Sequence, residues 1–113
     1  MYDILFNKNE EIQLISDDTK IYIQKTYKTY TCIITNQRLL ILDYPSPYHN
    51  SKEDLRISGK MTYIRKKEVI SSVDLKDIIS IDYKNKYCKI NIKDDKYINI
   101  NDTEVINYLN KVI

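Results

Sequence analysis

The side chains that most often carry out catalysis are sparse in this sequence. The single histidine, His49, has no cysteine or serine beside it in a known nucleophile pattern, and Cys32 and Cys88 lack the spacing of metal ligands. No GxGxxG, GxxxxGKS/T or HExxH motif occurs. Adjacent acids are more typical of turn formers than of general acid–base pairs: Glu10–Glu11, Asp17–Asp18 and Asp94–Asp95. We therefore expect no enzyme, no metal site, no cofactor and two free thiols.

Lysine and tyrosine are the residue types that remain for recognition, and they recur in residues 25–30, Lys-Thr-Tyr-Lys-Thr-Tyr. Phosphate groups are bound by several charge-assisted donors held together, and tyrosine offers a protein partner apolar area with a polar tip. A second lysine pair at 66–67 adds charge if its strand lies beside the first. The candidate interaction surface therefore consists of six residues: Lys25, Tyr27, Lys28, Tyr30, Lys66 and Lys67.

The composition favours one small β-rich domain covering residues 1–113. The chain contains 20 isoleucines and 11 tyrosines but one glycine and no tryptophan, and β-branched and aromatic side chains suit a pleated sheet. The longest apolar run has four residues, 39–42, far short of the roughly 20 that cross a bilayer. The N-terminus has no signal-peptide pattern. We expect a cytoplasmic protein.

The net charge of +2 is too small to indicate a nucleic-acid binder by itself. Its distribution is uneven, because residues 1–19 carry −4, residues 20–70 carry +6 and residues 71–113 are balanced. This asymmetry is compatible with a mildly basic face on the first half of the fold. Solvated strand faces and loops are the favoured explanation.

The first half of the chain indicates hairpins. One strand is expected to begin over 21–25, and a second over 27–31 that continues through the β-formers at 30–35, with a turn near 26–29 between them. Asn36–Gln37 suits a second, tight turn. The return strand, 39–44, begins apolar on both faces, so we expect it to be central in a sheet and covered.

Two segments lack a clear strand pattern. Residues 4–19 indicate a first turn or short strand followed by a loop. Residues 44–60 contain both prolines, the glycine and the histidine, and we expect them to be the most mobile internal segment.

The second half of the chain indicates a strand at 69–73 and then a meander. Leu75 and Ile78 are expected to plug the core from the turn at 74–78. Tight polar turns at 84–86 and 93–96 separate three stretches in which apolar and polar residues alternate. The inward residues of these stretches are expected to be Ile79, Ile81, Tyr83, Cys88, Ile90, Ile92, Ile98 and Ile100.

The period then changes to that of an amphipathic helix over 102–112. Its apolar stripe comprises Val105, Ile106, Leu109, Val112 and Ile113, and either Asn101 or Asp102 caps its start. So short a helix is stable only when its stripe packs on something, here an open end of the sheets. The whole core is expected to include Ile21, Ile23, Ile34, Leu39, Ile41, Leu75, Ile78, Ile81, Ile90, Ile92, Ile98, Ile100, Ile106 and Leu109.

Two local motifs and this element order resemble the bacterial pleckstrin-homology (PH) and GRAM families. Residues 35–39, Thr-Asn-Gln-Arg-Leu, are similar to their TNxRL hairpin, and residues 73–81 to the segment that leads into their second sheet. Asn9–Glu10 stands where GRAM-like domains often have Gly-Glu. The resemblance covers about residues 10–113. It implies a mostly β (α+β) fold, a PH-like partly open barrel of two antiparallel sheets with about seven strands, capped by one C-terminal helix.

The resemblance implies a non-enzymatic binding module. Its free strand edges and tyrosine-rich hairpin favour binding of a protein partner or self-assembly into a homo-oligomer. The alternative is weak binding to an anionic membrane surface or lipid headgroup. Binding of single-stranded nucleic acid to the interleaved lysines and tyrosines is the least favoured of the three.

Overall fold

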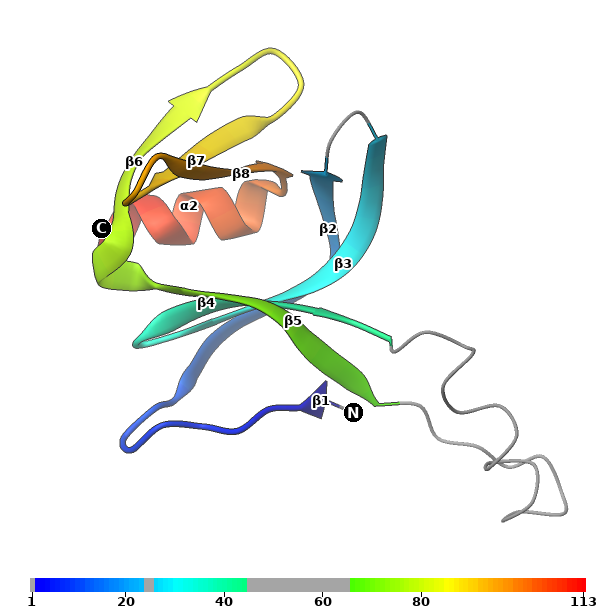
Figure 1. The fold of residues 1–113 in the computed structure, drawn as a ribbon, viewed down its shortest axis with the longest axis vertical. Coiled ribbons are helices and arrows are strands. Elements are labelled where there is room, and N and C mark those ends of the chain that lie inside the picture. The colour runs from blue at the N-terminus through cyan, green and yellow to red at the C-terminus, as the bar shows by residue number, and fades with distance from the viewer. Residues whose placement is uncertain (1, 24–25, 45–65) are drawn as a thin grey trace, which may run out of the picture.

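The computed structural model describes residues 2–23, 26–44 and 66–113, and these form a mostly β fold with one helix at the C-terminal end (Figure 1). The mostly-β α+β class is therefore confirmed. The predicted excursion at 44–60 lies almost entirely outside the described residues. The elements are β1 (Tyr2–Asp3), β2 (Ile12–Ile23), β3 (Thr26–Thr35), β4 (Arg38–Asp43), β5 (Lys67–Asp74), a 3-10 helix (Leu75–Asp77), β6 (Ile78–Tyr83), β7 (Cys88–Ile92), β8 (Lys96–Asn101) and α2 (Thr103–Val112).

Backbone pairing joins the eight described strands into one mixed sheet that does not close, in the order β1-β5-β4-β3-β2-β8-β7-β6. The parallel pair is β1 with β5, and it spans two residues of each strand. Strand β2 connects the two halves, since it pairs with β3 along its length and with β8 through Lys20–Tyr22. The sheet curls so that α2 lies in its concave side (Figure 1). The sheet therefore ends at β1 and at β6.

The structure corrects the prediction for the N-terminal region, because β2 begins at Ile12 rather than near residue 21. The strand is not evident from the sequence because Ser16, Asp17 and Asp18 interrupt its apolar pattern. A register shift between Ser16 and Thr19 accommodates these polar residues. The hydroxyls of Ser16 and Thr19 both donate to Asp102 Oδ2, at 2.5 and 2.6 Å respectively. Hydrogen bonds thus replace apolar burial here. Ile23 pairs with Thr26, so β3 begins earlier than predicted, and residues 24–25 lie outside the described residues.

The main core lies between the concave face of the sheet and α2, largely as predicted. Ten of the predicted core residues are buried: Ile21, Ile34, Leu39, Ile41, Ile78, Ile90, Ile92, Ile100, Ile106 and Leu109. Leu75, Ile81 and Ile98 are partly buried against this cluster, and the side chain of Ile23 lies outside the described residues. The prediction for Ile79 is wrong: it is 68% exposed, because a bulge between Ile78 and Ser80 shifts it out of the alternation. Tyr83, also expected inside, is 64% exposed.

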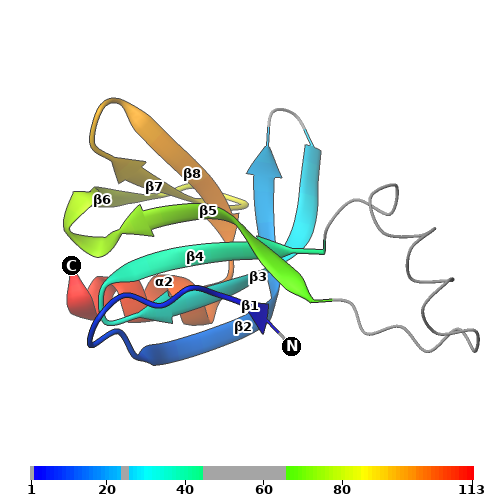
Figure 2. The same cartoon turned by 60° about the horizontal axis from the view of Figure 1, so that its bottom comes forward.

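A second, smaller core lies on the other face of the sheet. Ile33, Leu40 and Leu42 are fully buried there under Tyr2 and Ile4 of the N-terminal segment. Figure 2 shows that segment running across the strands before the chain turns back into β2. Because both faces of β4 are covered, the prediction that this strand is central is confirmed.

The C-terminal helix forms where it was predicted. Asp102 rather than Asn101 is the N-cap, and its Oδ1 accepts from the backbone N–H of Val105 at 3.2 Å. Val105, Ile106 and Leu109 are buried, whereas Val112 and Ile113 remain exposed at the end of the stripe. None of the helices in the described residues has the length and apolar character needed to cross a membrane.

Candidate functional site

The six predicted surface residues do not form one surface. Tyr27 is 53% exposed, whereas Tyr30 is 8% exposed and belongs to the main core, which corrects its assignment to the surface. Lys28 is exposed and pairs with Asp43. Because successive strand residues point to opposite faces, Lys28 and Tyr30 lie on the face opposite to Tyr27.

The remaining three residues also separate. Lys25 lies outside the described residues, and Lys66 is exposed just before β5. Lys67 is held within the protein, because its Nζ donates to Thr31 Oγ1 at 2.6 Å and lies 3.5 Å from Asp17 Oδ1. Of the six predicted residues, Tyr27 and Lys66 are therefore the two that are exposed and form no ion pair in the described part of the chain.

Tyr27 belongs to a different cluster, on the convex side of the sheet. Its ring centroid lies 5.1 Å from that of Tyr22, which in turn lies 5.3 Å from that of Tyr87. Lys20 Nζ lies 5.5 Å from the centroid of the Tyr27 ring. A pocket of about 400 Å³ is lined by these residues together with Lys84 and Lys86 of the β6–β7 turn. We call this surface the basic tyrosine face: Lys20, Tyr22, Tyr27, Lys84, Lys86 and Tyr87.

Strands β7 and β8 extend the basic tyrosine face. Lys89 Nζ lies 4.5 Å from the centroid of the Tyr97 ring, and Tyr97 is 56% exposed. Asn99 pairs across the strands with both Lys89 and Tyr22, so these three residues share one face of the sheet. Sequence reasoning missed this extension because it depends on the pairing of β2 with β8, which are about 80 residues apart.

A groove of about 560 Å³ separates the end of α2 from β6. It is lined by Thr35, Asn36, Leu75, Lys76, Ile78, Ile79, Tyr108, Val112 and Ile113, so its walls are mostly apolar. Beyond it, Asn110 Nδ2 donates to the hydroxyl of Tyr83, which ties the helix to the strand. Within the described residues β6 is the last strand of the sheet, and its outer edge has no ladder partner.

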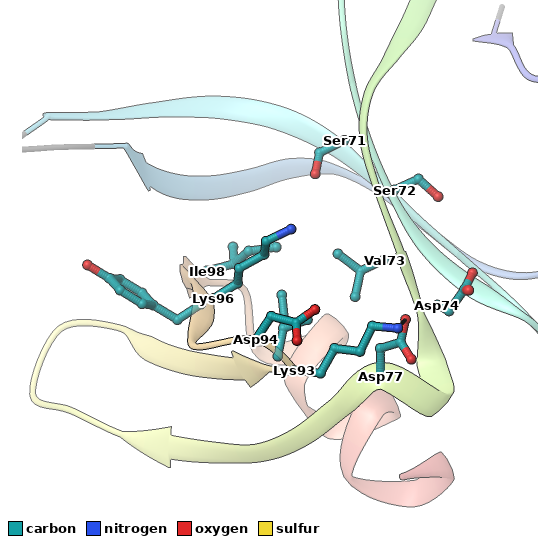
Figure 3. Close-up of a pocket in the computed structure, with 11 residues that line it drawn as sticks. Ser71, Ser72, Val73, Asp74, Asp77, Lys93, Asp94, Lys96 and Ile98 are labelled. Carbon is teal, nitrogen blue, oxygen red and sulfur yellow. Dashed lines mark ion pairs between the residues drawn. The ribbon is translucent and has the colours of Figure 1, made fainter.

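A further pocket of about 420 Å³ lies in the opening of the sheet between β5 and the β7–β8 turn (Figure 3). Lys93 lies beside Asp77 on one wall of the pocket: its backbone N–H donates to the Asp77 carbonyl at 3.0 Å, and its Nζ is 3.4 Å from Asp77 Oδ2. The other charged residues that line it are Asp74, Asp94 and Lys96. Since acids and lysines nearly balance, this pocket has little preference for an anion or a cation.

The hairpin motif of residues 35–38 holds the N-terminal loop rather than a ligand. Arg38 Nε donates to Glu10 Oε2 at 2.7 Å and Nη2 to Oε1 at 2.9 Å, and the Glu10 side chain is fully buried. Thr35 Oγ1 donates to the same carboxylate at 2.6 Å. Asn36 accepts from the Glu11 N–H and donates to the Asn9 carbonyl. These contacts make Glu10 a structural residue.

Asn9 occupies a left-handed backbone conformation, with φ of 61°. Asparagine tolerates this region and glycine adopts it without steric cost, whereas a β-branched residue does not. We expect Asn9→Gly to change the free energy of unfolding by less than about 0.5 kcal/mol, and Asn9→Val to lower it by about 1–2 kcal/mol. Urea unfolding followed by circular dichroism measures both. Equal stability of the two variants would contradict the assignment.

Neither cysteine is prepared for nucleophilic chemistry. Both are free thiols, Cys32 fully buried and Cys88 partly so. Burial raises the pKa of both thiols, and in Cys32 the negative charge of Asp102 adds to the effect. Among the residues that the structure describes, no three side chains of the metal-ligating types gather at one place.

Comparison with known proteins finds no relative. The chain matches no protein-family model, no curated protein and no solved structure.

Proposed function

We propose that this chain is a non-enzymatic binding module with a PH-like fold. Support comes from the topology: four antiparallel strands, β2–β5, and three more, β6–β8, meet where β2 pairs with β8, and one helix follows. The motif residues give further support, because Thr35 and Arg38 jointly hold Glu10. Asn9 needs the left-handed conformation at a position where GRAM-like domains often have glycine.

The binding activity that the geometry supports best is self-assembly through β6. The tyrosine-rich hairpin is a weaker candidate, because β2 and β3 are both interior strands. Strand β6 instead ends the sheet, has no lysine or arginine, and has Asp82 as its one charge. Charged side chains, lysine above all, are the usual protection of a free edge. The open, nearly uncharged edge of β6 is the observation that carries the proposal.

The face of β6 toward α2 is complementary to itself. Ile79 and Tyr83 are its exposed apolar residues, with Ile81 midway between them. A two-fold axis through Ile81 would pair the regular part of β6, Ser80–Tyr83, antiparallel with its copy. It would bring Ile79 of each protomer, which the bulge turns outward, beside Tyr83 of the other. Apolar residues opposite aromatic ones stabilise antiparallel strands. The same axis would set the hydroxyl of Ser80 in each protomer opposite the carboxylate of Asp82 in the other. A second copy of this chain is therefore the proposed partner.

The Ile79→Lys variant tests this assembly. We expect the unmodified chain to be a dimer at 100 µM by light scattering coupled to size exclusion. Lysine at this position would place two buried, unpaired charges in the interface, so we expect the dimer dissociation constant to rise at least about 30-fold, equivalent to 2 kcal/mol.

The matched control is Leu5→Lys, which introduces the same side chain at an exposed position of the N-terminal loop. It should leave the dimer intact, and both variants should unfold within about 0.5 kcal/mol of the parent. A parent chain that stays monomeric at several hundred micromolar, or equal weakening by the two variants, would refute assembly through β6.

A further inference from the structure

The convex side of the sheet has a second surface that assembly through β6 does not use. We propose that the basic tyrosine face, extended by Lys89 and Tyr97, binds single-stranded nucleic acid. It lies where Lys20–Tyr22 of β2 pair with the end of β8, next to the β6–β7 turn and the start of β7 (Figure 1). The inference is independent of the proposed assembly.

Uncompensated positive charge is the first argument. Lys20, Lys84, Lys86 and Lys89 form no ion pair among the described residues, whose ion-paired cations are Lys28, Arg38, Lys67 and Lys93. The acid closest in the strand register is Asp82, opposite Lys89, and its carboxylate accepts from Asn91. Four lysines along one face give a track of the kind that follows a phosphate backbone.

The position of the aromatic rings is the second argument. Tyr27 and Tyr97 are about half exposed, and each has a lysine ammonium near its ring, at 5.5 and 4.5 Å respectively. Each ammonium lies over the ring face, so a base that stacks there would displace it and leave it within reach of the neighbouring phosphate. Stacking of this kind contributes about 1–3 kcal/mol per base without selecting the base strongly.

The amide side chains are the third argument, and they favour nucleic acid over a membrane surface. Asn85 and Asn101 are both exposed and line the pocket between the lysines. Amides are suited to the edges of unpaired bases, which present donors and acceptors side by side. An anionic bilayer would use the lysines but neither the stacked rings nor the amides.

Fluorescence anisotropy with labelled 12-mers of oligouridylate and oligothymidylate tests the proposal at 50 and 200 mM salt. We expect the full chain to bind one or both, with an affinity that falls as salt rises. Tyr27→Ala should weaken binding about 5- to 150-fold, the equivalent of one lost base stack, whereas Tyr27→Phe should bind like the parent. Lys84→Gln combined with Lys86→Gln should reduce the slope of log affinity against log salt by about 1.4.

The control combines Lys8→Gln with Lys111→Gln, which removes the same charge from the N-terminal loop and α2 and should leave the salt slope unchanged. Ile79→Lys should bind the oligonucleotides like the parent, which separates this site from the assembly surface. Circular dichroism checks that each variant is folded, and the lysine variants keep the test valid if Tyr27→Ala does not fold.

Two results would overturn the proposal. One is an absence of oligonucleotide binding at 50 mM salt, with or without retention on vesicles containing 30% phosphatidylserine. Retention on those vesicles would assign the lysines to a membrane surface instead. The other is binding that the lysine variants and the control weaken equally, because the basic tyrosine face would then not be the site.

Discussion

Arg38→Ala is expected to lower the free energy of unfolding by about 3–5 kcal/mol, the usual cost of removing one member of a buried ion pair. Arg38 makes two hydrogen bonds to Glu10, and the carboxylate that would remain is fully buried. Thr35 and the Asn7 backbone N–H still donate to it, at 2.6 and 2.9 Å. Neither donor has a charge, so the negative charge would lose its counterion.

A second variant separates the charge from the packing of the arginine. Glu10→Gln combined with Arg38→Ala removes the buried charge along with its partner, so we expect the double variant to be more stable than Arg38→Ala alone. Urea unfolding at pH 7 measures both. Additive losses, in which the second substitution makes the protein less stable still, would show that the pair contributes through packing and not through charge.

The same pair makes stability depend on pH at the acid end. Hydrogen bonds from Arg38, then from Thr35 and the Asn7 N–H, lower the pKa of Glu10 from 4.5 to about 2 despite its burial. Between these values the unfolded chain binds more protons at this site than the folded chain does, so stability falls as pH falls. We expect this contribution to be complete above about pH 4.5 and lost toward pH 2. Unfolding midpoints of Glu10→Gln across this range should fall less steeply than those of the parent.

The elements that sequence reasoning located best are those whose pattern is local. The covered strand β4, the turns at 84–86 and 93–96 and the helix over 103–112 each follow from residues a few positions apart. Asp94 and Asp95 illustrate this, because both have positive φ, at 64° and 58°, which their side chains tolerate in a tight turn.

The elements that were missed depend on contacts distant in sequence. Polar residues in β2 are held by Asp102, more than 80 positions away. Ile79 was placed inside because alternation does not reveal a bulge.

The exposure of the candidate surface residues was predicted in part, for a similar reason. Tyr27 was correctly expected to be exposed, but Tyr30 shares its residue type and spacing and is buried. What differs is the face of β3, and that face follows from a register that the sequence leaves open. The pairing of β2 with β8 places three residues in the same pocket as Tyr27: Lys84, Lys86 and Tyr87. Residues of a turn look like solvated polar residues until a neighbouring strand is placed beside them.

The docking of α2 on the sheet depends largely on one apolar side chain, that of Leu109. Leu109 lies at the centre of the helix stripe and is fully buried in the main core, between the strands of both halves of the sheet. Replacing it with alanine removes most of the side chain and leaves a cavity that the rigid strands cannot fill. We expect Leu109→Ala to lower the free energy of unfolding by about 2–5 kcal/mol.

Val112→Ala is the matched control, because Val112 belongs to the same stripe but is 44% exposed, on the wall of the groove beside β6. It should cost less than about 0.5 kcal/mol, since little apolar area leaves the core. Urea unfolding monitored by circular dichroism compares the two. A helix of ten residues is too short to be stable undocked, so a docked helix should unfold together with the sheet in a single transition. A cost below about half a kcal/mol for Leu109→Ala, or helix signal that is lost before the strand signal, would mean that the sheet does not depend on the helix for its core.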